Sequence, residues 1–155
     1  MRDQRFVAEH RGGPLKKEQH KQLIRWAYGC VEHVLPLLAG QADTRILHAI
    51  FIAREWGRGR VPTGEAMKAS LAAHAAAREA ADPVEVALAR AAGQAVATAH
   101  MSDHSLGGAL YALKAVKAAG RSVEDERQWQ VAQLPPEVKG LVLEIMAIKA
   151  KSFRM

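Results

Sequence analysis

Apolar residues recur at three- and four-residue intervals through most of this chain, and many of them are alanine. That spacing matches the 3.6-residue turn of an α-helix, in which such positions fall on one face. No stretch of the sequence alternates apolar and polar residues for long enough to indicate a β-strand. Small side chains bury little area each, so such helices must gain stability from close approach over many contacts. The sequence therefore predicts an all-α fold, a compact bundle of about six or seven helices with short loops.

Proline, glycine and capping residues divide the periodic pattern into helices. The first helix begins near Lys17 and should end or bend at Pro36, because proline lacks the amide hydrogen that a helix interior requires. Asp82 followed by Pro83 is the clearest boundary, since aspartate can accept from free amides and proline suits the first helical position. Other helix starts are expected at Asp43, Thr63, Ser122 and Pro135-Pro136, and helix ends at Gly57, Gly59 and Gly120.

The length of 155 residues suits one domain with a shared core, so we expect a single all-α domain over residues 1–155. Its basic N-terminal segment 1–16 and its C-terminal tail 150–155 are the candidates for flexible segments. No apolar run approaches the roughly 20 residues that a membrane span needs, and the N-terminus leads into no signal-peptide core. The single cysteine, Cys30, cannot form an internal disulfide and fits a reducing compartment. These features predict a cytoplasmic protein without a membrane partner.

The chain carries 22 basic against 16 acidic residues, a formal net charge of +6. The basic residues gather in two groups, Arg2, Arg5, Arg11, Lys16, Lys17, Lys21 and Arg25 near the N-terminus, and Lys149, Lys151 and Arg154 near the C-terminus. A basic surface permits contact with nucleic acid or with an acidic protein. It can also serve only to keep an alanine-rich protein soluble, which is the interpretation we favour. Few aromatic residues accompany the N-terminal group, so nucleic acid is the less favoured partner.

Two histidines and an aspartate lie close together near residue 100. On a helix, His100 and His104 would share one face, with Asp103 near enough to orient one imidazole, as in a two-histidine metal pair. The glutamate of a His-Glu-x-x-His motif is missing, so we predict no metal site, and the pair is at most a weak candidate. The favoured interpretation is that Ser102 or Asp103 caps the next helix while the histidines pack at the junction. His74, His100, Asp103 and His104 are the candidate contacts with a partner or ligand.

Small residues mark places where helices should approach closely. His74 is flanked by alanines on both sides, which indicates a polar group packed against a neighbouring helix. Gly107-Gly108 lies within an expected helix, where glycine is roughly 1 kcal/mol less favourable than alanine. A packing reason for this pair is therefore expected.

No complete catalytic motif is present in the sequence. It contains no phosphate-binding glycine loop, no Gly-x-Ser-x-Gly elbow and no Cys-x-x-Cys pair. Cys30 and His33 lie one helical turn apart, a spacing that could activate a thiol, but most lone helical cysteines are inert packing groups. We therefore expect neither enzymatic activity nor a cofactor.

Several segments together resemble a bacterial family of immunity proteins, the immunity-five-like domain of polymorphic toxin systems. These segments are Arg5–Leu15, His33–Pro36, Ala72–Glu79, Ala92–His104 and Gln133–Glu137. The similarity extends from Arg5 to about Val142. The resemblance implies a small all-α cytoplasmic protein that binds and neutralises a cognate toxin by protein–protein contact. It implies no particular functional residues.

Other classes of function stay open on the residues alone. The chain could be a generic helical interaction module, which includes contact with a second copy of itself. It could instead bind nucleic acid through its basic N-terminal segment. A metal-dependent enzyme, the least favoured class, would require His74, His100, Asp103 and His104 to converge on one pocket.

The net charge also bears on the kind of toxin. Inhibitors of nuclease toxins often present an acidic surface to a basic cleft, and such complementarity speeds association. The candidate acids Glu124, Asp125 and Glu126 are flanked by Arg121 and Arg127. A charge of +6 therefore indicates that the toxin is not a basic nuclease or that the contact is mainly apolar.

Overall fold

The protein is seen in a computed structural model that describes residues 3–152. Over that range it consists of helices without a β-strand, which confirms the predicted all-α bundle of six or seven helices. The α-helices are α1 (Lys17–Val34), α2 (Thr44–Gly57), α3 (Thr63–Glu79), α4 (Pro83–Ala97), α5 (His104–Ala118), α6 (Val123–Ala132) and α7 (Pro136–Ser152). Short 3-10 helices are η1 (Gln4–Phe6), η2 (Glu9–Arg11) and η3 (Leu35–Leu37). Of the two candidate flexible segments, residues 1–2 and 153–155 lie outside the described range.

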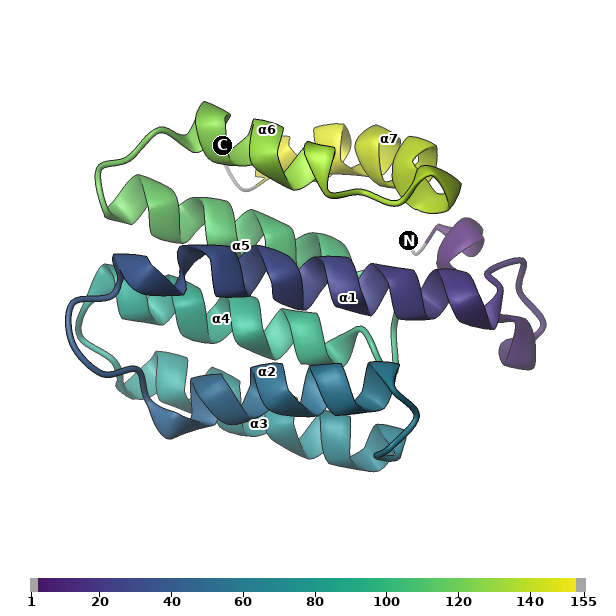
Figure 1. The fold of residues 1–155 in the computed structure, drawn as a ribbon, viewed down its shortest axis with the longest axis horizontal. Helices are drawn as coiled ribbons and strands as arrows, with labels where there is room; N and C mark the ends of the chain where they lie inside the picture. The colour runs from purple at the N-terminus through teal and green to yellow at the C-terminus, as the bar shows by residue number, and fades with distance from the viewer. Residues whose placement is uncertain (1–2, 153–155) are drawn as a thin grey trace.

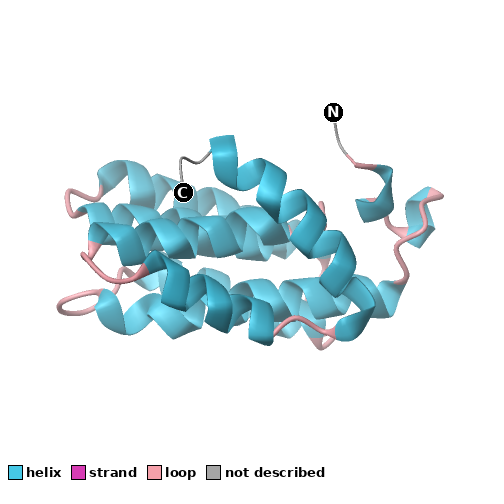
Figure 2. Ribbon diagram, turned by 90° about the horizontal axis from the view of Figure 1, so that it is seen from above, coloured by secondary structure: helices cyan, strands magenta, loops and turns pink. Residues whose placement is uncertain are grey.

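Helix α4 lies at the centre of the bundle (Figure 1). It packs against α5, α3, α2 and α1, and α5 packs in turn against α1. The antiparallel pair α2 and α3 lies on one side of α4, while α6 and α7 lie beyond α5 and α1 on the other side (Figure 1). Helix α7 runs obliquely across the bundle and contacts α1 and α5 only lightly (Figure 2). None of the described helices combines the length and apolarity that crossing a membrane would require.

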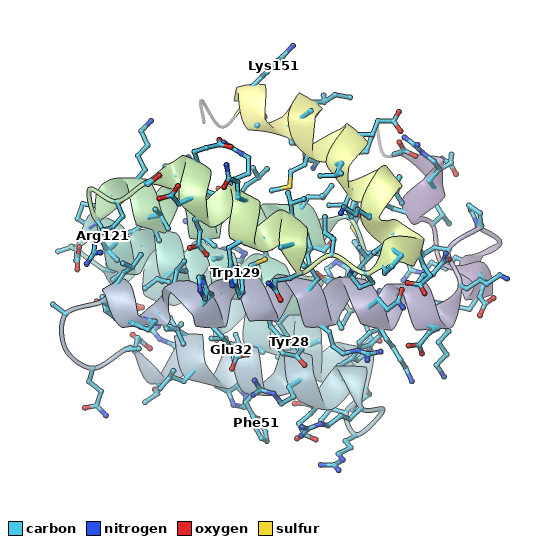
Figure 3. All side chains as sticks on the ribbon, turned by 45° about the horizontal axis from the view of Figure 1, so that its top comes forward. Tyr28, Glu32, Phe51, Arg121, Trp129 and Lys151 are labelled. Carbon is cyan, nitrogen blue, oxygen red and sulfur yellow. The ribbon has the colours of Figure 1, made fainter. Side chains whose placement is uncertain are left out.

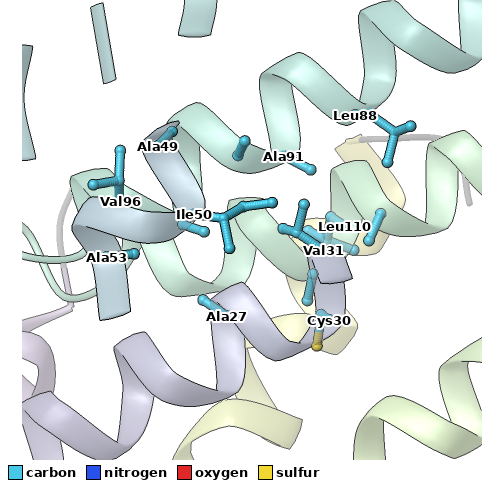
Figure 4. Packing of buried hydrophobic residues seen from close by; sticks show 14 of the residues in the cluster. Ala27, Cys30, Val31, Ala49, Ile50, Ala53, Leu88, Ala91, Val96 and Leu110 are labelled. Atoms are coloured by element: carbon cyan, nitrogen blue, oxygen red, sulfur yellow. The ribbon is translucent and has the colours of Figure 1, made fainter. Parts of the chain in front are cut away.

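Small residues let the central helices approach closely (Figure 4). A Cβ atom on Gly108 of α5 would lie 3.4 Å from the Cβ of Ala27 in α1 and 3.4 Å from the Cα of Ala95 in α4. A Cβ atom on Gly107 would lie 2.7 Å from the Gln94 side-chain oxygen. Both glycines therefore have the packing reason that the sequence predicted. Larger buried side chains such as Leu88, Val31 and Leu110 fill the space between these close contacts (Figure 4).

Most of the predicted helix boundaries are confirmed. The side chains of Asp43, Asp82 and Ser122 each accept a hydrogen bond from a backbone amide in the first turn of the helix that follows. Gly59 and Gly120 follow the ends of α2 and α5 with φ angles of +74° and +72°, a conformation that glycine adopts at little cost.

Two helices, α3 and α5, begin without the side-chain caps that the sequence predicted. Pro62 precedes α3, and the Thr63 hydroxyl accepts instead from the Trp56 indole at 3.1 Å. The indole N–H is half-buried and requires an acceptor, which explains why this hydroxyl does not cap the helix. Asp103 precedes α5, but its backbone is helical (φ −70°, ψ −13°) and its side chain makes no capping bond to the described helix. The Ser102 hydroxyl donates to the Phe6 carbonyl rather than capping α5.

The N-terminal segment 3–16 packs beside the start of α1 and is connected to later parts of the chain (Figures 1 and 2). Phe6 is fully buried, and its carbonyl oxygen accepts the bond from Ser102. Arg5 forms an ion pair with Glu144 of α7 at 2.7 Å. The segment thus joins the beginning of α5 to α7.

Candidate functional site

The structure brings the three predicted histidines together across α3, α4 and α5. The His100 and His104 rings lie 5.5 Å apart between centroids, but His100 lies in the turn between α4 and α5, so the two histidines do not share the single helix that the metal-pair interpretation assumed. Nδ1 of His104 lies 2.7 Å from the side-chain oxygen of Gln94, and Nδ1 of His74 lies 2.8 Å from the guanidinium of Arg90. Arg90 and Gln94 are one turn apart on α4, so this helix connects His74 of α3 with His104 of α5.

His74 is a neutral, packed side chain. Burial lowers its pKa below the ordinary value of 6.5, and the charges of Arg90, Arg78 and His104 lower it further. Because a guanidinium can only donate hydrogen bonds, Nδ1 of His74 accepts from Arg90 and the ring proton resides on Nε2. The ring lies directly on Gly93 of α4, where an added Cβ atom would be 2.7 Å from Nε2.

These contacts account for the histidine cluster as polar packing between helices. Gly93 and Gly107 make room for the side chains of His74 and Gln94. His74 bonds to Arg90 and His104 bonds to Gln94, and both partners lie on α4. Asp103 lies half-buried beside them at the start of α5. Within residues 3–152, no group of three or more histidine, cysteine, aspartate or glutamate side chains is arranged to hold a metal ion. A contact between the cluster and a partner stays a prediction.

A second feature, which the sequence did not reveal, is the exposed side of α1. It forms a ridge between two grooves. The groove between α1 and α2 has a volume of about 480 Å³ and includes Lys21, Arg25, Tyr28, Arg54 and Arg58. The groove between α1 and α6 has a volume of about 250 Å³ and includes Arg25, Trp26, Gly29 and Trp129. Arg25 lines both grooves because it lies on the crest of the ridge.

Ion pairs and a cation–π contact order the groove between α1 and α2. The Arg54 guanidinium lies 5.0 Å from the centre of the Tyr28 ring and 2.5 Å from the Glu32 carboxylate. Arg25 pairs with Glu18 at 2.9 Å, but half of its side chain remains exposed. These contacts hold the cations in place on the surface while leaving Arg25 accessible.

The groove between α1 and α6 is bounded by an ordered aromatic side chain. The Trp129 ring is stacked on His33, with 3.5 Å between centroids and 4° between planes. His33 is held in turn by Glu126, 2.6 Å from its Nδ1. Cys30 is fully buried, and burial together with the Glu126 charge raises its pKa, which agrees with an inert packing group.

Helix α2 extends this surface with apolar side chains. Leu47, Phe51, Arg54 and Arg58 follow one another along one stripe of the helix, and half of Phe51 is exposed. Figure 3 shows Trp129, Tyr28 and Phe51 on the same side of the molecule. We define the α1 face as Lys21, Arg25, Tyr28, Gly29, Phe51, Arg54, Arg58 and Trp129.

Comparison with known proteins identifies the family. The sequence model of the family described as "Imm-5 like putative immunity protein" matches residues 13–137. The chain belongs to this family. No curated protein and no solved structure matches it.

The Imm-5-like match confirms the resemblance seen in the sequence and covers both candidate sites. The histidine cluster and all residues of the α1 face lie within residues 13–137. The first 12 residues and nearly all of α7 lie outside the match. Membership of an immunity-protein family also implies the kind of partner, which is a toxin.

Proposed function

We propose that this Imm-5-like protein binds a cognate bacterial toxin by direct protein–protein contact and neutralises it in the cytoplasm, without catalysing a reaction. The observation that carries this proposal is the family match over most of the chain. A polymorphic toxin system supplies the biological setting for such a pair.

The surface chemistry supports a role in protein binding. The α1 face presents tryptophan, tyrosine, phenylalanine and arginine side chains, the residue types enriched in protein interfaces. They lie on α1, α2 and α6 rather than on loops. Helix α1 packs against α2, and it contacts α6 through the Trp26–Gln130 bond and the His33–Trp129 stack, so a partner would meet a surface that is already ordered.

The test begins with the tagged chain expressed in its own host and gently purified. Native mass spectrometry should detect a stoichiometric protein partner, which peptide mass spectrometry then identifies. Expression of that partner alone should arrest growth, and co-expression of this chain should restore it.

The control is co-expression of an unrelated helical protein of similar size, which should not restore growth. A partner that is harmless when expressed alone would contradict the immunity function. So would a toxic partner whose effect continues when it is bound to this chain.

A further inference from the structure

We infer that the α1 face is the toxin-binding surface, and that the toxin contributes an acidic surface with a narrow segment that lies over Gly29. This inference rests on the proposed function and specifies the chemistry of the partner.

The charge of the groove between α1 and α2 indicates an acidic partner. Four cationic side chains and one carboxylate line it, namely Lys21, Arg25, Arg54, Arg58 and Glu18. Lys21 makes no ion pair with any described residue, and half of the Arg58 side chain is exposed. The carboxylate that pairs with Arg58, that of Glu55, is almost completely buried and offers little negative charge to a partner. Carboxylates on a partner match the planar arginine groups in geometry as well as in charge.

Gly29 indicates a close approach by the partner. It lies inside α1, where glycine is roughly 1 kcal/mol less favourable than alanine. Gly93, Gly107 and Gly108 have neighbours that a Cβ atom would meet at 2.7 to 3.4 Å, whereas a Cβ atom on Gly29, as on Gly64 and Gly140, would meet no described atom within 4 Å beyond the adjacent backbone of its own helix. Of these three open glycines, Gly29 is the one that lines a groove beside α1. Packing within the described chain therefore does not require a glycine here. The missing side chain leaves open the floor of the groove beside Trp129.

Two aromatic side chains of the face can act as anchors. Trp129 is held by its stacking on His33, so little side-chain freedom remains to be lost on binding. Phe51 is half exposed although it is a large apolar residue. Tryptophan and arginine are enriched among the few positions that carry most of the affinity in an interface, and Trp129 and Arg25 line the same groove.

The same surface suits a protein better than a nucleic acid. Glu18 lines the α1–α2 groove and Glu32 pairs with Arg54, so carboxylates interrupt the cations, which do not form the continuous basic track that a phosphate backbone follows. Phe51 and Leu47 continue the surface with apolar area that phosphates cannot use. An acidic protein surface with an apolar centre fits both features.

The experiment measures the affinity of purified variants for the protein partner recovered by the purification described under Proposed function, at low and at physiological salt. Gly29→Gln should fill the groove and weaken binding by about 30-fold or more, the effect of losing one strong interface position. The same variant should unfold at a higher temperature than the wild type, because glutamine favours a helix more than glycine does. Loss of affinity in a more stable protein cannot be attributed to misfolding.

A charge-reversed variant tests the acidic partner. Lys21→Glu combined with Arg25→Glu should weaken binding by about 30-fold, and the loss should be larger at low salt. The matched control, Lys68→Glu combined with Lys139→Glu, makes the same charge change at exposed positions outside the α1 face and should bind like the wild type.

The possible outcomes distinguish this inference from the proposed function. Equal toxin affinity in all variants would overturn the α1 face as the interface and leave the immunity function intact. A wild-type chain that retains no toxin would overturn both. A short DNA duplex that binds the wild type more tightly than the toxin does, and is lost in the charge-reversed face variant, would assign the face to nucleic acid instead.

Discussion

Gly29 and Gly93 offer a direct test of the packing described above, because the same change to alanine should have opposite effects at the two sites. Both glycines lie inside helices. Beyond the adjacent backbone of its own helix, a Cβ atom on Gly29 would meet no described atom within 4 Å, whereas one on Gly93 would meet three ring atoms of His74 at 2.7 to 2.9 Å. Carbon atoms normally pack at about 3.5 Å or more, so the ring would have to move by roughly 0.7 Å or more.

The magnitudes follow from two terms. Alanine is more favourable than glycine in a helix by about 1 kcal/mol, so Gly29→Ala should raise the free energy of unfolding by about that amount and the Tm by about 2–4 °C. Overpacking costs about 1–3 kcal/mol. Gly93→Ala should therefore lower the free energy of unfolding by about 0–2 kcal/mol. In a His74→Ala background the clash is absent, and Gly93→Ala should again stabilise by about 1 kcal/mol.

Urea unfolding of the three single variants Gly29→Ala, Gly93→Ala and His74→Ala, and of the two double variants that combine His74→Ala with each glycine change, measures these terms. The coupling between positions 74 and 93 should be about 1–3 kcal/mol, whereas Gly29→Ala should show no coupling to His74→Ala. If Gly93→Ala stabilises the protein equally in both backgrounds, the His74 ring does not pack on Gly93 and the reasoning fails.

Three further predictions concern ionisable groups. The Cys30 thiol, whose pKa burial raises, should not react with Ellman's reagent in the folded protein but should react in urea. The side-chain hydrogen bond from Arg5 lowers the pKa of Asp3 from 3.8 to about 2, and an NMR titration of Arg5→Gln should return it toward 3.8. The lowered pKa of His74 means that the unfolded chain binds a proton more readily, so its contribution to stability is complete above pH 6.5 and declines as the pH falls below that value. Urea unfolding above and below pH 6.5 should show a smaller acid-induced loss for His74→Gln than for the wild type.

Local sequence signals predicted the helices because they depend on neighbours a few residues away. The apolar spacing gave the all-α class, and Asp43, Asp82 and Ser122 were correct as caps because each bonds an amide within the next turn. Thr63 was wrong as a cap because its hydroxyl serves a tryptophan on the preceding helix. Ser102 did not cap α5 because its partner is Phe6, 96 residues earlier in the chain.

The candidate sites, too, combine features that depend on nearby residues with features that depend on residues far away in the sequence. The proximity of His100 and His104 was expected from helical spacing, but a turn between α4 and α5 produces it instead. The links through Arg90 and Gln94 could not be predicted, because they depend on how α3 and α5 sit on α4. The α1 face depends on α6 packing beside α1, which the bond from Trp26 to the Gln130 carbonyl fixes across 104 residues of sequence.

The anchoring of the N-terminal segment has a consequence for synthesis of the protein. Arg5 pairs with a carboxylate 139 residues later, so its partner leaves the ribosome about 7 to 28 s after Arg5 at ordinary rates of translation. Until then the segment cannot complete its contact with α7. A chain truncated before Glu144 would lack this contact but would keep the bond from Ser102 to Phe6, so the segment is fixed in two stages during synthesis.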